Sequence, residues 1–250
     1  MCIRDSLITF LDAIPSDHLT HLISLLASER GTTARRMLRQ LITRYAARNL
    51  DASLPRLATE SEAVAADLLQ AFVTAAPERS AEILKSISVR GELEIHYRML
   101  DIMKGMDNIT ELLDELYGLL ESSVADIRRG AMRLLANNSD VRFFGKLMEI
   151  LNTNTGIDLD EAEEIGQTMA VANPSACERA FADWVTPKSI FSLKRVTIRK
   201  TQKWAAISAI GICPGEHNAK RINKLKDTEG EEVRQHCIRT LDQRRRKGIQ

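Results

Sequence analysis

The stretch "GEEVRQHCIRTL", residues 230 to 241, carries an apolar–basic pair followed by residues at the spacing of one helical face. Val233 opens the pattern, Arg234 follows it, and Cys237, Thr240 and Leu241 stand four, seven and eight residues after Val233. These offsets fall on one side of an α-helix, which has about 3.6 residues per turn. The stretch therefore predicts an amphipathic helix, and its pattern is a template for the rest of the chain.

The template recurs six more times. "IRRGAMRLLA" and "ARRMLRQLI" match every position, "QKWAAISAIG", "VAADLLQAF" and "IHYRMLDIM" follow, and "AEEIGQTMA" is the weakest copy. A second apolar helical stretch, such as "RFFGKLMEIL", lies between successive copies. Repetition at intervals of 30, 31, 32, 35, 40 and 31 residues predicts stacked units, each a helical hairpin. The copies begin at Ala34, Val64, Ile95, Ile127, Ala162, Gln202 and Val233.

The composition agrees with a folded helical chain. Of its 250 residues, 44% are hydrophobic and 28% are charged, whereas glycine (12), proline (6) and aromatic residues (4%) are sparse. The sequence contains no apolar run of the roughly 20 residues that cross a bilayer and no secretory signal, so we expect a cytoplasmic location and no membrane span. The four cysteines form no CxxC pair, which predicts buried reduced thiols.

The copies "ADIRRGAMRLLA" and "GEEVRQHCIRTL" resemble the second helix of HEAT repeats and of related bacterial HEAT-like repeats. That helix typically opens with an acid, then Val-Arg, then Ala and Leu, and "SLPRL" is similar to the proline-bearing first helix. The resemblance covers residues 34 to 245. It implies an all-α fold, an α-solenoid that forms a right-handed superhelix of about seven stacked helical hairpins over residues 1–250. The second helices would line its concave groove.

The basic residue after the apolar one has a structural explanation in such a stack. A side chain beside the buried stripe can bury its stem between units while its guanidinium reaches a neighbouring carboxylate or loop carbonyl. We therefore predict structural roles for Arg35, Arg128 and Arg234. The alternative is a ladder of arginines that binds an acidic ligand in the groove.

The first six residues, "MCIRDS", resemble a non-native leader. The amphipathic stretch that follows has no polar cap, although a solenoid end needs a capping unit with a polar outer face. We therefore expect residues 1–6 to be foreign and residues 7 onward to be the C-terminal part of a longer protein.

The sequence lacks the motifs that most directly indicate catalysis. It contains no phosphate-binding glycine loop, no HExxH, no nucleophile elbow and no metal-ligand cluster. The acidic run "IDLDEAEEIGQ" lacks the glycine-centred alternation and the closing glutamate of a calcium loop, so its acids are predicted to complement a helix dipole. We predict that the chain is not an enzyme and has no catalytic residue, metal or cofactor.

Charge is segregated along the chain although the net charge is only +1. Residues 1–100 carry 12 basic and 12 acidic groups, residues 101–187 carry 7 and 16, and residues 188–250 carry 16 and 6, which gives 0, −9 and +10. The long interval of 40 residues holds a basic, aromatic insertion at 186–201 between copies five and six. This insertion and its border are predicted to bind a partner, unless they form an extended solvated connection anchored by its tryptophans. The candidate residues are Trp184, Lys188, Lys194, Arg195, Arg199, Lys200, Lys203 and Trp204.

Three functions follow from these patterns and from the resemblance. The favoured one is a non-enzymatic scaffold that binds a protein partner through its concave groove and its basic C-terminal surface. The partner would be acidic where it meets that basic surface. The alternative is nucleic-acid binding, because the chain is similar in architecture to HEAT-like DNA glycosylases, with anionic lipid in the same class of partner. The third is an analogy to the HEAT repeats of phycobilisome lyases, for which the sequence offers no bilin-binding feature. A groove of mixed charge favours protein, and a uniformly basic groove favours nucleic acid.

Overall fold

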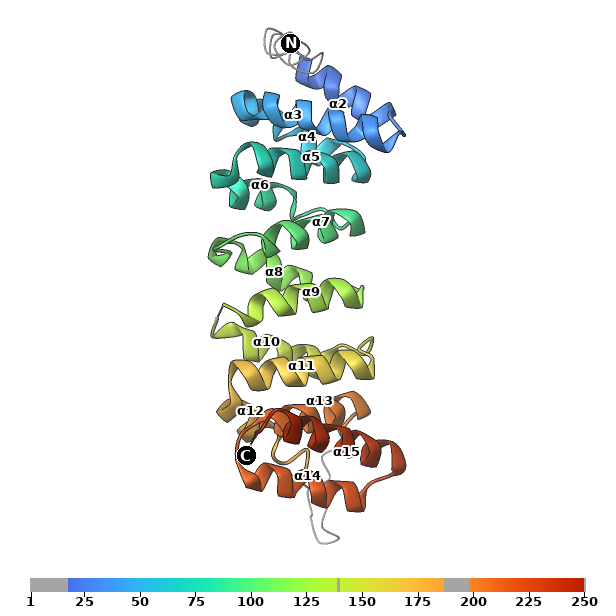
Figure 1. Ribbon diagram of the computed structural model, residues 1–250, viewed down its shortest axis with the longest axis vertical. Coiled ribbons are helices and arrows are strands. Elements are labelled where there is room, and N and C mark those ends of the chain that lie inside the picture. The colour runs from blue at the N-terminus through green and yellow to red at the C-terminus, as the bar shows by residue number, and fades with distance from the viewer. Residues whose placement is uncertain (1–17, 139, 187–197, 250) are drawn as a thin grey trace. The chain divides into compact units, whose positions relative to one another are not determined.

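The computed structural model describes residues 18–138, 140–186 and 198–249, and every regular element in these ranges is a helix (Figure 1). The prediction of an all-α fold is confirmed for this part of the chain. The α-helices are α2 (His18–Ser28), α3 (Thr32–Ser53), α4 (Arg56–Thr59), α5 (Glu62–Ala75), α6 (Ser80–Ile87), α7 (Leu93–Lys104), α8 (Leu113–Leu119), α9 (Ala125–Ala136), α10 (Arg142–Thr153), α11 (Leu159–Ala172), α12 (Pro174–Phe181), α13 (Lys200–Ile212), α14 (Glu216–Thr228) and α15 (Glu231–Arg246), with short 3-10 helices η1 (Pro77–Arg79) and η2 (Thr110–Leu112).

The odd-numbered α-helices carry the sequence repeat. Helices α3, α5, α7, α9, α11, α13 and α15 each contain one copy, and each begins two residues before the first position of its copy, or three residues before it in α11. The even-numbered helix that precedes each of them is shorter. The sequence period thus correctly predicts the repeat helices and a further helix between successive copies.

Local chemistry explains where several of these helices begin. Asp158 caps α11, because its side chain accepts a hydrogen bond of 2.7 Å from the backbone N–H of Glu161. Asn173 caps α12 in the same way, at 3.0 Å from the N–H of Ala176, and Pro174 fills the first helical position, where no N–H is needed. The predicted role of acids at the start of α11 is therefore confirmed for Asp158.

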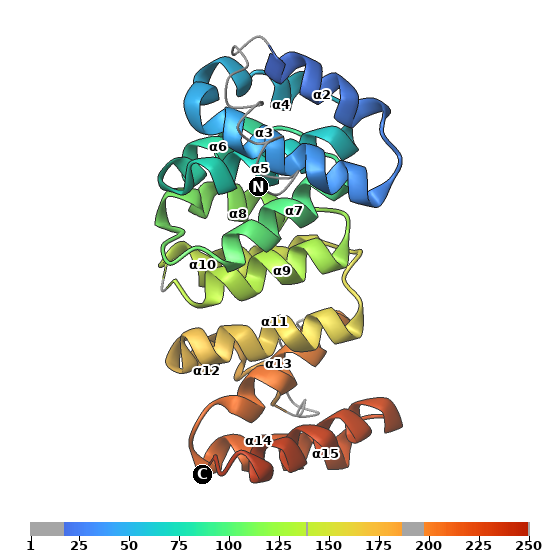
Figure 2. The same ribbon diagram turned by 45° about the horizontal axis from the view of Figure 1, so that its top comes forward.

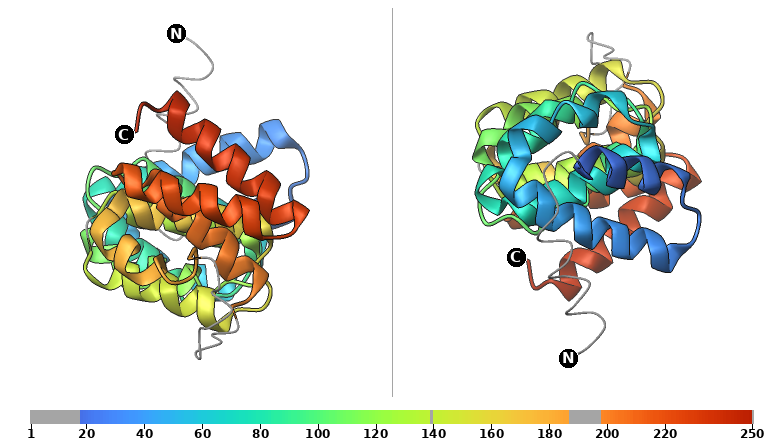
Figure 3. Two further views of the ribbon diagram at one scale, coloured as in Figure 1. Left: turned by 90° about the horizontal axis from the view of Figure 1, so that it is seen from below. Right: turned by 90° about the horizontal axis from the view of Figure 1, so that it is seen from above.

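The chain divides into two compact units, Met1–Glu115 and Leu116–Gln250, with the boundary in α8. In the first unit, α2 packs on α3, α3 on α5, and α5 on α7, as the blue to green helices of Figure 1 and the right panel of Figure 3 show. Its core consists of aliphatic and aromatic residues from these helices and from α4 and α6. Fully buried examples are Leu26, Ile42, Leu57, Phe72, Ile83 and Ile95.

In the second unit, α11 packs on both α9 and α13, and α15 packs on both α13 and α14. Helices α14 and α15 lie side by side in Figure 2 and in the left panel of Figure 3. Helices α11 and α13 approach each other closely, because a Cβ atom on Gly166 would lie 2.1 Å from the carbonyl oxygen of Ala205. Only glycine allows this approach, and it fixes the separation of the two helices.

No helix within the described ranges combines the length and the apolar character that a membrane crossing requires.

Candidate partner-binding surface

The predicted basic and aromatic cluster lies in the second unit, at the start of α13 and after the end of α12. The structure describes Trp184, Arg199, Lys200, Lys203 and Trp204. The other three predicted residues, Lys188, Lys194 and Arg195, lie outside the described residues.

Trp204 belongs to the core rather than to the surface. It is 5% exposed, and its indole stacks on the imidazole of His236 from α15, with ring centroids 4.2 Å apart and an interplanar angle of 6°. The Nε2 atom of His236 lies 3.0 Å from Ser208 Oγ and 3.3 Å from the carbonyl oxygen of Trp204. The stack therefore joins α13 to α15, and neither ring is available to a partner.

The two lysines near Trp204, Lys200 and Lys203, differ in the exposed fraction of their side chains. Lys203 Nζ donates to Glu229 Oε1 at 2.6 Å, and its side chain is only 17% exposed. Lys200 Nζ lies 2.6 Å from Glu232 Oε2 and 5.7 Å from the centroid of the Trp204 ring, but 48% of its side chain stays exposed. An exposed ion pair is worth little, so Lys200 can exchange Glu232 for an acidic group of a partner at small cost.

Arg199 forms polar contacts within the protein. Its guanidinium donates to the carbonyl oxygens of Leu151 and, at 3.3 Å, Asn154, at the C-terminal end of α10. Its backbone N–H donates to Gln202 Oε1 at 2.8 Å, in the first turn of α13. A cation at the C-terminal end of a helix interacts favourably with the helix dipole, so Arg199 ties α13 to α10.

Trp184 is half-buried in the turn that follows α12. Its ring packs against Phe181, with centroids 5.0 Å apart and the planes tilted by 53°. Part of the indole is open to solvent. Among the described members of the cluster, Trp184 and Lys200 are therefore the ones whose side chains are accessible to a partner.

The buried histidine beside Trp204 makes stability depend on pH. Burial lowers the pKa of His236 from 6.5 to about 4, since the ring is 1% exposed and its charged form would lose hydration. Between these values the unfolded chain binds more protons than the folded one, so stability is full above the unfolded pKa and decreases as the pH falls. From pH 7 to pH 5 we expect a loss of about 2 kcal/mol in the free energy of unfolding, measured by urea denaturation.

The variant His236→Gln is the control for this effect. It should remove that part of the pH dependence, whatever its stability at pH 7. Equal slopes of unfolding free energy against pH in the wild type and the variant would contradict the assignment.

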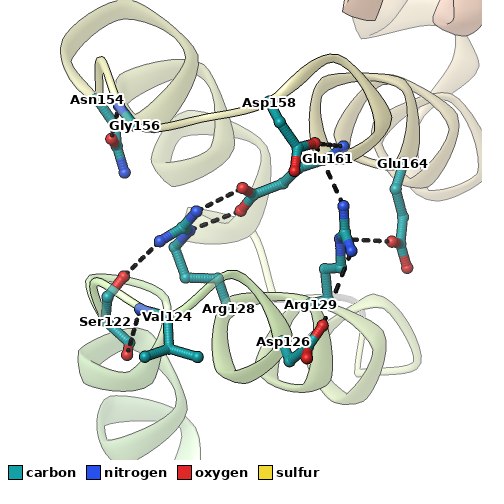
Figure 4. Close-up of polar contacts among 10 residues, drawn as sticks. All are labelled: Ser122, Val124, Asp126, Arg128, Arg129, Asn154, Gly156, Asp158, Glu161 and Glu164. Atoms are coloured by element: carbon teal, nitrogen blue, oxygen red, sulfur yellow. Dashed lines mark hydrogen bonds and ion pairs between the residues drawn. The ribbon is translucent and has the colours of Figure 1, made fainter.

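Arg128 has the structural role that its position in the repeat predicts (Figure 4). Its side chain is 5% exposed and forms a two-pronged ion pair with Glu161 of α11, whose side chain is 2% exposed. Its third contact is a hydrogen bond of 2.7 Å to the carbonyl oxygen of Ser122, just after α8. The hydrogen bonds to Glu161 raise the pKa of Arg128 further above its usual range.

The next arginines on α9 also meet acids of α11. Arg129 lies between Asp126, Asp158 and Glu164, at 3.8, 3.3 and 3.4 Å (Figure 4). Arg133 Nε donates to Glu164 Oε1 at 2.7 Å. The acidic run predicted to complement a helix dipole therefore has a second role, because it also neutralises the arginines of the preceding repeat helix.

Arg35 repeats the arrangement in the first unit, but Arg234 does not. The Arg35 guanidinium donates to Asp67 of α5 and to the carbonyl oxygens of Leu26 and Glu29 at the end of α2. Arg234 is 56% exposed, and it pairs at 3.8 Å with Glu231 of its own helix. The predicted structural role of Arg234 is wrong, because this residue stands on the outer side of α15, whose buried face carries His236 instead.

Two further arginines hold helix ends, and the template does not single them out. Arg90 donates to the carbonyl oxygens of Leu57, at 2.7 Å, and Glu60, at 3.0 Å, at the end of α4. Arg244 is buried and donates to the carbonyl oxygens that end α13. Its acceptors are Gly211, Cys213 and Gly215, at 3.1, 2.6 and 2.9 Å.

The described cysteines are buried in this fold. Cys177, Cys213 and Cys237 are buried free thiols, which confirms the prediction for these three, and Cys2 lies outside the described residues. Burial raises the pKa of the Cys237 thiol to about 11, so little nucleophilic thiolate is present at neutral pH. Among the described residues, no group of three or more histidine, cysteine, aspartate or glutamate side chains has metal-binding geometry.

No protein-family model matches this sequence, and no curated protein matches it. The class of protein is therefore defined by the fold, an all-α chain of repeated helices, and by the surfaces described above.

Proposed function

We propose that the chain is a HEAT-type repeat scaffold without catalytic activity, which binds a partner protein through the groove of its repeat helices and through a basic surface at 186–201. Six of the seven repeat helices begin two residues before their sequence copies, which supports a repeat of the HEAT type. A single right-handed solenoid over the whole chain is the architecture that this proposal implies. The proposal includes a cytoplasmic location for the protein.

One observation carries the choice of protein over nucleic acid: two of the three arginines at the second template position are neutralised by acids of the next repeat helix. Arg35 pairs with Asp67, and Arg128 pairs with Glu161. Lys203 is likewise paired with Glu229, just before α15. Duplex binding depends on cations that remain available to phosphates, and these cations are already engaged.

The outward positions of the repeat support the same choice. The residue six places after the start of each copy is exposed on several repeat helices, and its chemistry changes from copy to copy. A surface of alternating charge and polarity suits a protein partner, whereas a nucleic acid selects a uniformly basic stripe. The exposed examples are Gln40, Asp101, Arg133 and Arg239.

The basic surface is tested by reversing three of its predicted charges. The variant Lys188→Glu, Lys194→Glu, Arg195→Glu should lose a partner captured from a lysate of the source organism and identified by mass spectrometry. Arg199 is left unchanged, because it caps α10 and its reversal would destabilise the protein. The matched control reverses three exposed residues elsewhere in the second unit, Lys224, Arg246 and Lys247. Equal capture by both variants would contradict a binding role for 186–201.

Nucleic acid is tested directly with a random DNA duplex. The wild type should bind it only weakly at physiological salt, because residues 101–187 carry a net charge of −9 and repel phosphates. Fluorescence anisotropy over a salt series gives both affinity and slope, and each neutralised phosphate contributes about −0.9 to the log–log slope. Tight, steeply salt-dependent binding that the triple Glu variant abolishes would replace the scaffold proposal with the nucleic-acid alternative.

A further inference from the structure

Two of the described cysteines meet between α12 and α13. Cys177 lies in α12, and Cys213 directly follows the last residue of α13. The two helices pack on each other, and the Cys213 thiol donates a hydrogen bond of 3.4 Å to the carbonyl oxygen of Pro174, in the first turn of α12. The two thiols also share a side-chain hydrogen bond. The fold therefore brings together two sulfur atoms that are 36 positions apart in the sequence.

The contact makes the two thiols chemically unequal. The hydrogen bond from Cys177 lowers the pKa of Cys213, and the charge of Arg244, which donates to the Cys213 carbonyl oxygen at 2.6 Å, acts in the same direction. Burial and the charge of Glu178 oppose this change. The hydrogen bond with Cys213, together with burial, raises the pKa of Cys177. Cys213 is thus the thiol that loses its proton more readily, and Cys177 stays protonated beside it.

Cys237 provides a comparison within the same unit. It is as fully buried as Cys177 and Cys213. Burial raises the pKa of the Cys237 thiol to about 11, and the side chains that act on it are charged groups rather than a second thiol. Burial therefore does not explain the lowered pKa of Cys213, whereas its contact with Cys177 does.

We propose that Cys177 and Cys213 form a redox site, which a hydroperoxide such as hydrogen peroxide converts reversibly into a disulfide. The Cys213 thiolate attacks one peroxide oxygen, the O–O bond breaks, and Cys213 becomes a sulfenic acid. The hydroxide that leaves takes up the proton that Cys213 lost. The Cys177 sulfur then attacks the Cys213 sulfur, the S–S bond forms, and the sulfenic hydroxyl leaves as water with the Cys177 proton. The two thiols lose two electrons, which reduce the peroxide to two molecules of water.

Burial sets the conditions of this reaction. Neither sulfur is exposed, so peroxide reaches the pair only when the protein opens locally, and the reaction is slower than that of an exposed thiol. In a reducing compartment such a disulfide is transient. It would join α12 to α13, the helices on either side of the predicted binding segment 186–201. The inference goes beyond the proposed function, because this chemistry needs no partner.

The test treats the reduced, purified full chain with an excess of hydrogen peroxide, alkylates the remaining thiols and identifies the tryptic peptides by mass spectrometry. Trypsin places Cys177, Cys213 and Cys237 on separate peptides. We expect the Cys177–Cys213 cross-link in at least about tenfold excess over the Cys213–Cys237 cross-link, because only the first pair is in contact. Dithiothreitol should reduce it.

Oxidation of the unfolded chain in urea is the control for this preference. Cys213 and Cys237 are only 24 positions apart. A flexible chain closes the shorter loop more readily, so the order should reverse and favour Cys213–Cys237 by roughly twofold.

Three variants test the unequal roles of the thiols, with dimedone as a trap for sulfenic acid. In Cys177→Ser, the serine hydroxyl can still donate a hydrogen bond to the Cys213 sulfur, so dimedone should label Cys213. In Cys213→Ser, dimedone should leave Cys177 unlabelled. Cys237→Ser is the matched control at a buried thiol and should form the Cys177–Cys213 cross-link as the wild type does. Circular dichroism confirms that each variant is folded.

Several outcomes would overturn the inference. They are an absence of the Cys177–Cys213 cross-link in the native wild type, the same mixture of cross-links in the native and unfolded chains, a cross-link that dithiothreitol does not reduce, or dimedone labelling of Cys177 in place of Cys213. The peptide mapping of the wild type does not depend on any variant. Because the assay uses no captured partner, its failure leaves the scaffold proposal standing.

Discussion

The substitution Gly166→Ala should destabilise the second unit by at least ~3 kcal/mol, because the new Cβ would lie 2.1 Å from the carbonyl oxygen of Ala205. The atom that it meets belongs to the backbone of α13, so no side-chain rotation relieves the clash and the two helices must separate. Separation also disturbs the buried faces of α11 and α13, which are packed on each other. Urea denaturation of the purified protein measures the change.

A matched glycine in the same unit should respond with the opposite sign. Gly145 lies inside α10, and an added Cβ there has no neighbouring atom within 4 Å. Gly145→Ala should therefore stabilise the protein by about 0.5–1 kcal/mol, the usual difference in helix propensity between the two residues. A similar change in both variants would show that α11 and α13 are not in close contact.

The second large effect is expected at the buried ion pair between α9 and α11. Glu161→Gln removes the charge that compensates Arg128, whose side chain is 5% exposed, and should cost about 3–5 kcal/mol. Arg128→Met should cost a similar amount, because it leaves the buried Glu161 side chain without its partner and also removes the donor to Ser122. The double variant Arg128→Met, Glu161→Met should recover much of the loss, since no uncompensated charge remains.

A nearby exposed pair serves as the control for this experiment. Arg133 and Glu164 also join α9 to α11, but 67% of the Arg133 side chain is exposed. Arg133→Met should change the free energy of unfolding by less than ~1 kcal/mol. Losses that simply add in the Arg128, Glu161 double variant would mean that the two groups do not interact.

Helix positions could be predicted because they depend on local spacing. Even the weakest copy, which begins at Ala162, lies in a helix, since its register still places Ile165, Met169 and Ala170 on a buried face. The role of Arg128 was also predictable, because a long basic side chain beside a buried stripe can bury its stem only if its guanidinium reaches an acceptor on a neighbouring helix or loop. Arg234 shows the limit of that rule, since the same offset in α15 faces outward.

The candidate site was less predictable, because its residues are decided by tertiary contacts. Composition marked Trp204 and Arg199 as a surface, but burial of Trp204 needs His236 from 32 residues later, and Arg199 needs a helix end 45 to 48 residues earlier.

The pair of Arg128 and Glu161 also restricts how this protein can be recombined. The two residues are 33 positions apart, close to one repeat, so most cuts that exchange a single unit at a loop fall between them. A chimaera made this way would leave one buried charge in each parent piece. An exchanged segment must include both α9 and α11, or the sequence that replaces α11 must supply an acid at the position of Glu161. In this part of the chain, the smallest segment that can be exchanged without separating the pair is therefore two neighbouring repeats rather than one.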